Sequence, residues 1–252
     1  MKNAIETLGA DKVKDLVNKF AKELKIPPHL HIEYALNVCI IKPGLAPDIN
    51  KKREKKLSAE GCVKEWVKKF AQGYGKCISK QQAKPPQTKA DTAVVRIIQK
   101  VAGCRAAGAT RIMYAHRLGM SAENILGHLL EEFLFKKLAS AGWVMAWGST
   151  ITAVDFCNSA GEVLQVKNRD NTENSSSNKV REGNEEISLW VRGNSKNGST
   201  NWVDLKDLLH LPTDIKGLNE DGFLKFIDDT LKKNPNIIAL DSDSPYIKKG
   251  DK

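Results

Sequence analysis

The most constraining feature of the sequence is an extended pattern over residues 151–168 that is interrupted by one turn signal. Its first part, ITAVDFC, is apolar and rich in β-branched residues, and its second part, EVLQVKN, alternates between apolar and polar residues. Between them stands NSAG, whose residue types favour a tight turn. The pattern predicts a β-hairpin with Asp155 in the first strand, and with Gln165 and Lys167 on one face of the second strand.

Asp155, Gln165 and Lys167 can therefore converge on one site. A carboxylate and a neutral oxygen can hold Mg²⁺ against a phosphodiester, while a lysine orients the attacking water or offsets developing charge. The spacing resembles the PD-(D/E)xK nuclease core, although Gln165 replaces the usual second acid and Val154 replaces the usual proline. Glu162 does not easily take that place, because even-numbered residues of this strand lie on the face opposite the odd-numbered Lys167. The alternative is an ordinary aspartate near a turn and an ordinary edge-strand lysine.

A helical pattern, SAENILGHLLEEFLFKKLASAGW, precedes the hairpin and suggests Ser121 as its N-cap. Glu131 lies at the edge of its apolar stripe, and Glu132 is expected to point away. Glu131 can supply the acid that Gln165 does not, or it is an ordinary boundary residue in a salt bridge. The predicted stripe consists of Leu126, Leu129, Leu130, Phe133 and Leu134.

Three segments carry a resemblance to a known family: GHLLEEFLFKKLASAGWVMAWGSTITAVDFC, LQVKNRDNTENSSSNKVREG and LWVRGNSKNGSTNW. Together they resemble the SinI-type restriction endonucleases, which are similar to PD-(D/E)xK nucleases, and the resemblance covers roughly residues 110–205. It implies a Mg²⁺-dependent type II enzyme that cuts double-stranded DNA at a GG/CC-rich palindrome similar to GGWCC. It further implies a cognate DNA methyltransferase that acts on the same site without a stable complex. Because a palindrome presents the same base edges twice, we expect a homodimer.

The segment after the hairpin, NRDNTENSSSNKVR, is almost wholly polar and is typical of a flexible loop. Asparagine, serine and arginine are also the side chains that bind base edges, so the segment is a candidate recognition element, which the resemblance favours. A further strand is expected over residues 186–192, ending at Arg192, which is either a guanine contact or a surface charge. The candidate DNA-binding residues are Asn168, Arg169, Asn171, Asn174, Ser175, Arg181 and Arg192.

Composition limits the class of partner. With a formal net charge of +10 and 41% hydrophobic residues, the chain is a globular protein suited to a polyanion, either nucleic acid or an acidic membrane surface. No apolar run is long enough for a bilayer span, so we expect a cytoplasmic protein with no membrane partner. The five scattered cysteines read as reduced thiols, with Cys157 a small core residue. The basic run KKREKK is either a solvated face or a phosphate contact.

Helical patterns fill residues 1–85, and the polar stretch QQAKPPQTKAD is the best candidate for a linker. We therefore expect a helical amino-terminal region at 1–85, either separate or part of the same domain, and a catalytic and DNA-recognition domain at 90–252. A helix broken near Gly103 and Gly108 is predicted after the linker. Two further helices, WVDLKDLLHL and EDGFLKFIDDTLKKN, and a last strand, NIIAL, are predicted after the strand at 186–192.

These elements predict an α/β fold with a restriction-endonuclease-like mixed β-sheet core flanked by helices. Three functions remain open. The first is a type II restriction endonuclease, and the second is a structure-specific or repair DNA nuclease of the same fold. The third is a catalytically silent DNA-binding protein, which the replacement of an acid by Gln165 keeps in consideration.

Overall fold

The structure is a computed structural model that describes residues 1–49, 56–83, 91–170, 187–211, 215–239 and 244. Its α-helices are α1 (Lys2–Leu8), α2 (Ala10–Glu23), α3 (Ile32–Ile41), α4 (Ala59–Tyr74), α5 (Thr92–Ala102), α6 (Ala106–Leu138), α8 (Trp202–Leu208) and α9 (Glu220–Lys233). Its 3-10 helices are η1 (Pro28–Leu30), η2 (Pro43–Leu45), η3 (Ile78–Lys80), η4 (Ala139–Ala141), η5 (Trp147–Ser149) and η6 (Pro235–Ile237). Its strands are β1 (Trp143–Met145), β2 (Phe156–Asn158), β3 (Val163–Arg169) and β4 (Ser188–Gly193).

The chain divides into two compact units. The first combines Met1–Cys77 with Leu130–Leu224, and the second combines Ile78–Leu129 with Lys225–Lys252. The amino-terminal helices α1 to α4 therefore share a unit with the sheet. Whether residues 1–85 fold as a domain of their own is a separate matter and stays a prediction.

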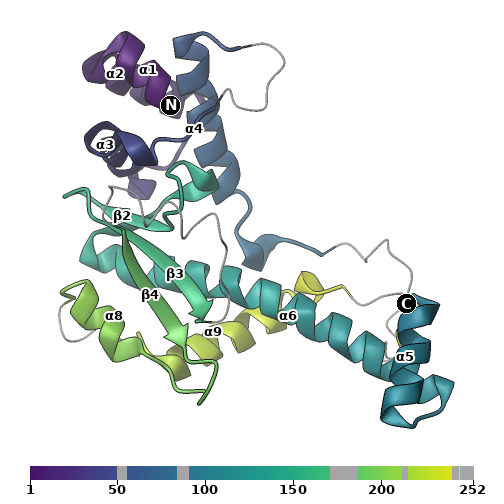
Figure 1. Cartoon of the computed structure of the whole chain (residues 1–252). Coiled ribbons are helices and arrows are strands. Elements are labelled where there is room, and N and C mark those ends of the chain that lie inside the picture. Colours follow the sequence, from purple (N-terminus) through teal and green to yellow (C-terminus); the bar gives the residue numbers. More distant parts are fainter. Residues whose placement is uncertain (50–55, 84–90, 171–186, 212–214, 240–243, 245–252) are drawn as a thin grey trace. The chain divides into compact units, whose positions relative to one another are not determined.

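The sheet has four strands in the order β1-β2-β3-β4. The first two pairings are antiparallel, and β3 runs parallel to β4, as the two neighbouring arrows in Figure 1 show. This mixed sheet, with helices around it, confirms the expected α/β class. The strand expected at 186–192 is confirmed as β4, and the short helix and the long carboxy-terminal helix are confirmed as α8 and α9.

The predicted hairpin is formed by β2 and β3. Its turn is stabilised by Asn158, whose side-chain oxygen accepts hydrogen bonds from the backbone N–H groups of Ala160 and Glu162. The first strand is shorter than expected, because β2 begins only at Phe156. Asp155 therefore lies immediately before the strand, and the prediction that it is part of the strand is wrong. Ala153, with a φ of 57°, has left the extended conformation two residues earlier.

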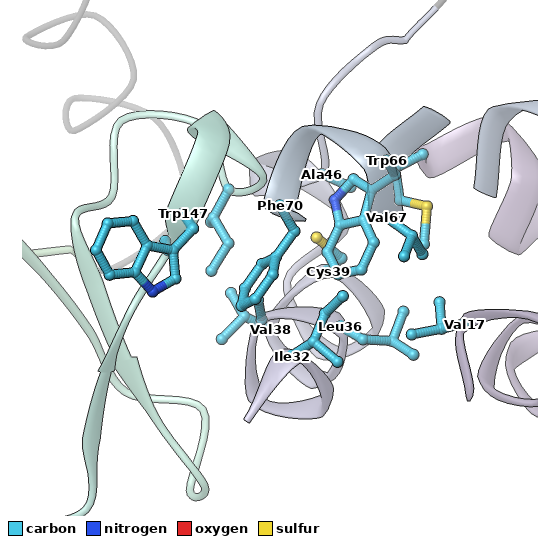
Figure 2. Packing of buried hydrophobic residues seen from close by; sticks show 14 of the residues in the cluster. Val17, Ile32, Leu36, Val38, Cys39, Ala46, Trp66, Val67, Phe70 and Trp147 are labelled. Carbon is cyan, nitrogen blue, oxygen red and sulfur yellow. The ribbon is translucent and has the colours of Figure 1, made fainter. Parts of the chain in front are cut away.

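One hydrophobic core joins the amino-terminal helices to the sheet. Figure 2 shows Trp66 and Phe70 of α4 in this core, together with Trp147 of η5, and all three are buried. Cys157 of β2 belongs to the same core. The indole N–H of Trp66 donates to the backbone oxygen of Thr150 at 2.9 Å. Since Thr150 directly follows η5, this bond ties α4 to the segment that leads into the hairpin.

Helix α6 differs from the prediction. The break at Gly103 is confirmed by its left-handed backbone (φ 60°), but Gly108 lies inside α6. Ser121 is not an N-cap either, because α6 continues through it. Its hydroxyl donates to the backbone oxygen of Arg117 at 3.0 Å, a bond that satisfies a serine inside a helix.

The expected strand NIIAL is wrong for its described residues, where the 3-10 helix Pro235–Ile237 is followed by two residues outside any strand. Strand β1 was not expected, because three residues are too few to show a period.

The basic run at 51–56, apart from Lys56, and most of the candidate linker lie outside the described residues. No helix in the described part of the chain is long and apolar enough to cross a membrane.

Candidate active site

Asp155 is held by two backbone hydrogen bonds and one side-chain hydrogen bond. Its carbonyl oxygen accepts from Ala146, and its N–H donates to Leu164, whose register partner is Phe156. Asp155 and Phe156 thus both lie opposite Leu164, and two residues opposite one is the arrangement of a β-bulge. Next to the bulge, the Asp155 carboxylate accepts a hydrogen bond from the backbone N–H of Val166 at 2.7 Å. In a regular ladder, a backbone carbonyl of the neighbouring strand would accept this bond. The carboxylate is therefore held against β3 between the backbones of Gln165 and Lys167.

Gln165 and Lys167 lie on the same face of β3, as predicted from the alternation. Gln165 is buried, at 7% exposure, and Lys167 is half-buried. Within the described part of the chain, the Lys167 ammonium has no hydrogen-bond or ion-pair partner. A half-buried ammonium is costly to leave without an anion, so this position suits a negatively charged ligand.

Glu131 is expected on the side of α6 that faces the segment carrying Asp155. Phe135, one helical turn after Glu131, packs edge-on against Trp147 with ring centroids 5.0 Å apart. Trp147 follows Ala146, whose N–H donates to the Asp155 carbonyl at 2.8 Å. Because residues four apart share a helix face, we expect Glu131 to be directed toward the same segment. Its exposure is intermediate.

Glu132 is not directed into solvent as expected, because it is only 4% exposed. The Lys136 ammonium lies 2.9 Å from its carboxylate. The physical reason is that this part of α6 is buried on several sides, so its apolar stripe has no fully exposed opposite face. The buried residues are Leu129, Leu130, Phe133, Leu134 and Leu138, whereas Leu126 is half-buried.

Arg192 has two strong interactions inside the protein. Its Nη1 lies 2.6 Å from the Glu220 carboxylate, and its Nε donates to the side-chain oxygen of Asn168 at 2.9 Å. The residue is only 9% exposed, so the alternative of a surface charge is wrong. Sequence reasoning missed Glu220, since it lies 28 residues away in another helix and nothing local marks it as a partner.

The other candidate DNA-binding residues divide into two groups. Arg169 is exposed at the carboxyl end of β3. Asn171, Asn174, Ser175 and Arg181 lie outside the described residues. Base contact by any of the candidates, Asn168 and Arg192 included, stays a prediction.

The candidate ligands are all oxygen donors. In the described ranges, no three His, Cys, Asp or Glu side chains come together in a way that could hold a metal ion. The expected set is of a different kind, namely the carboxylates of Asp155 and Glu131 with the amide oxygen of Gln165. Oxygen donors suit hard cations such as Mg²⁺. The neighbouring Cys157 does not add a soft ligand, because burial raises the pKa of its thiol to about 12 and keeps it protonated.

The buried thiols predict a pH dependence of stability. All five cysteines are free, and burial raises the pKa values of both Cys39 and Cys157 from 9.0 to about 12. Between these values the unfolded chain releases protons that the folded chain keeps. The free energy of unfolding should therefore fall as the pH rises above about 9, by up to about 1.4 kcal/mol per pH unit for each thiol.

Urea unfolding at pH 7.5, 9.0 and 10.5 checks this expectation. The control is the double variant Cys39→Ala, Cys157→Ala, which retains every other group that titrates in this range. Its loss of stability with pH should be shallower than that of the wild type, and parallel curves for the two proteins would contradict the assignment.

Comparisons with known proteins extend over most of the chain. The family model described as SinI restriction endonuclease matches residues 25–233. The type II restriction enzyme Eco47I of Escherichia coli is 36% identical over 189 residues, which are 73% of this chain and 80% of that protein. The type II restriction enzyme SinI of Salmonella infantis is 38% identical over 174 residues, which are 67% of this chain and 74% of that protein.

Proposed function

From the premise that the chain belongs to the SinI restriction endonuclease family, we propose that it hydrolyses double-stranded DNA at a GG/CC-rich palindrome similar to GGWCC, with Mg²⁺ as cofactor. Both relatives are named type II restriction enzymes, which supports this function over a structure-specific nuclease or a silent binding protein. The observation that carries the proposal is the Asp155 carboxylate held on β3 between Gln165 and Lys167.

Asp155, Gln165 and Glu131 are the proposed ligands of the cation. Asp155 is the principal one, because the Val166 N–H fixes its orientation. The amide oxygen of Gln165 is a weaker ligand for a hard cation than a carboxylate, so Glu131 raises the negative charge of the site. A bound Mg²⁺ would polarise the scissile phosphate and lower the pKa of the attacking water.

Lys167 is the proposed catalytic cation. Its half-buried ammonium lies on the face of β3 that also carries Gln165. A phosphate placed there would give the ammonium the anionic partner that no described residue supplies. As negative charge develops on the phosphorus oxygens, Lys167 stabilises it and orients the water that attacks.

Replacement of Lys167 by methionine should slow cleavage without weakening DNA binding comparably. Methionine keeps an unbranched apolar chain but removes the ammonium, and the loss of one such donor typically costs ~10²–10³-fold in rate. Single-turnover cleavage of a cognate duplex gives the rate, and binding measured without divalent cations gives the affinity.

Lys12→Met, at an exposed position of α2, removes the same charge and should cut at the wild-type rate. A Lys167→Met variant that cuts as fast as the wild type would remove Lys167 from the mechanism.

The function itself is tested with a long duplex that contains a single GGWCC sequence. With Mg²⁺, two discrete fragments are expected, and chelation of the metal should prevent cutting. A smear, or cutting only at junctions, would support a structure-specific nuclease instead. Absence of cutting with Mg²⁺ and with Mn²⁺ would support the silent binding protein.

The proposed recognition residues lie at the end of β3 and in the polar segment that follows it. We propose that Arg169, Asn171, Asn174, Ser175 and Arg181 contact base edges, since arginine binds guanine and asparagine binds adenine in a bidentate manner. A palindromic target also supports a two-fold homodimer with one site for each strand. A cognate methyltransferase acting on the same sequence, and a cytoplasmic location, belong to the same proposal.

A further inference from the structure

We propose that Glu220, Arg192 and Asn168 form a positioning unit, here called the Arg192 clamp, that fixes Lys167 for cleavage. The inference rests on the proposed function and deepens it. It assigns Arg192 to the support of a catalytic side chain, in place of the guanine contact that the sequence suggested, and it adds Glu220, which no sequence pattern indicated.

The Arg192 clamp is a closed set of contacts between β3, β4 and the first turn of α9. Both oxygens of the Glu220 carboxylate are used, one by Arg192 at 2.6 Å and the other by the indole N–H of Trp202 at 2.8 Å. The Arg192 guanidinium also lies over the Phe223 ring, 5.3 Å from its centroid. With 11% of its side chain exposed, Arg192 is held in one orientation by an acid, an amide and an aromatic ring.

The clamp acts on the residue next to Lys167. In the parallel ladder Lys167 pairs with Val191, so Asn168 lies beside Arg192, and both point to the face opposite Lys167. The bond from Arg192 Nε to Asn168 therefore holds the β3 backbone to β4 directly after the catalytic lysine. A fixed Asn168 restricts the backbone torsions that aim the Lys167 side chain.

The end of β3 needs such support. The strand ends at Arg169, only two residues after Lys167, and strand ends open more readily than strand centres. A second contact lies just beyond, where the Asp170 carboxylate accepts the N–H of Ser195 at 2.9 Å. Both contacts tie the carboxyl end of β3 to β4 or to the loop that follows β4. Lys167 is therefore held in place at a point where the ladder alone would fray.

A base contact made through Arg192 Nε or Nη1 would require breaking this arrangement. Its Nε and Nη1 are both in use, and removing Arg192 would leave the Glu220 carboxylate without its charged partner. Breaking a partly buried pair by withdrawing one member is unfavourable. The contacts thus favour a role that acts through Lys167 over one that acts on the DNA bases.

The test compares Glu220→Gln with Asp221→Asn, which removes the same charge from the exposed neighbouring residue of α9. Glu220→Gln should slow single-turnover cleavage by about 10- to 100-fold, since small misplacements of reacting groups cost rates of this order. Its affinity for the cognate duplex, measured without divalent cations, should stay within about threefold of wild type, which is under 1 kcal/mol. Asp221→Asn should match wild type in both.

The decisive measurement combines Glu220→Gln with Lys167→Met. If the clamp acts through Lys167, Glu220→Gln should cause little further loss of rate in the Lys167→Met protein. If Glu220→Gln slows the Lys167→Met protein by the same factor as it slows the wild type, the proposal is overturned, because such a loss of rate does not pass through Lys167. Wild-type cleavage by Glu220→Gln would overturn it as well, whereas failure of the wild type to cut any duplex would count against the proposed function instead.

Asn168→Ala provides a milder variant should Glu220→Gln not fold, because it leaves the pair between Arg192 and Glu220 intact. It should show the same loss of rate and the same lack of additivity with Lys167→Met. An Asn168→Ala protein that cuts at the wild-type rate would overturn the clamp. A loss of discrimination between cognate and non-cognate duplexes in Arg192→Lys, without a change in the cleavage rate of bound cognate DNA, would assign Arg192 to base reading and would also overturn it.

Discussion

Asp155→Asn should yield a folded protein that binds cognate duplex but does not cut it. Asparagine keeps a side-chain oxygen that can accept the N–H of Val166, so the contact that orders this part of β3 is preserved. What it loses is the negative charge that a hard cation requires. The loss of several kcal/mol of transition-state stabilisation corresponds to a fall in rate on the order of 10³-fold or more.

Glu162→Gln is the matched control, since it neutralises an exposed acid in the turn of the same hairpin. It should cut at the wild-type rate. Asp155→Ala removes the acceptor as well as the charge, so it should be less stable than Asp155→Asn while being equally inactive. Single-turnover cleavage and thermal unfolding measure the two effects separately. An Asp155→Asn protein with wild-type cleavage would contradict the proposed mechanism.

The hairpin was predictable because its signals are local. Alternation along β3 places Gln165 and Lys167 on one face, and the turn residues Asn158 and Gly161 stand where a reversal is needed. The family resemblance found in residues 110–205 was also sound, as the match over residues 25–233 confirms. Short-range periodicity and turn chemistry thus sufficed to locate the centre of the candidate site.

The start of the first strand was not predictable from the same pattern. ITAVDFC has the composition of a strand, but Ala153 adopts a positive φ and Asp155 takes part in a bulge. Both features result from tertiary contacts, including the bond from Thr152 to the Leu45 carbonyl. The consequence for function is that the bulge directs the Asp155 carboxylate to the Val166 N–H, which strand alternation alone would not have suggested.

The roles of Arg192 and Glu132 depended on partners elsewhere in the fold. A strand-end arginine reads as a surface charge until Glu220 and Asn168 are placed beside it. Glu132 reads as exposed when α6 is assumed to have a single buried stripe, and it is buried because the helix is covered on several sides. Helical periodicity predicts one buried face, and it fails where a helix runs through the interior.

Helix α4 approaches η5 closely at two glycines, Gly73 and Gly148. An added Cβ at Gly148 would lie 2.0 Å from the carbonyl oxygen of Lys69, and one at Gly73 would lie 2.2 Å from the nitrogen of Gly148. Helix α4 and η5 therefore approach each other at a distance that no side chain permits. Gly148 also has a φ of 70°, which favours glycine.

Gly148→Ala should consequently unfold or severely destabilise the whole first unit. The left-handed backbone costs an alanine about 1–2 kcal/mol, and forcing α4 away from η5 adds about 1–3 kcal/mol, against a total stability of about 5–15 kcal/mol for a typical domain. Gly127→Ala is the control, because it lies inside α6 with no atom within 4 Å of the new Cβ, and it should stabilise the protein by up to about 1 kcal/mol. Urea midpoints give both effects.

Because η5 leads directly into the segment holding Asp155, any folded Gly148→Ala protein should also cut slowly. A Gly148→Ala protein with the wild-type midpoint and wild-type cleavage would mean that the amino-terminal helices do not position the hairpin.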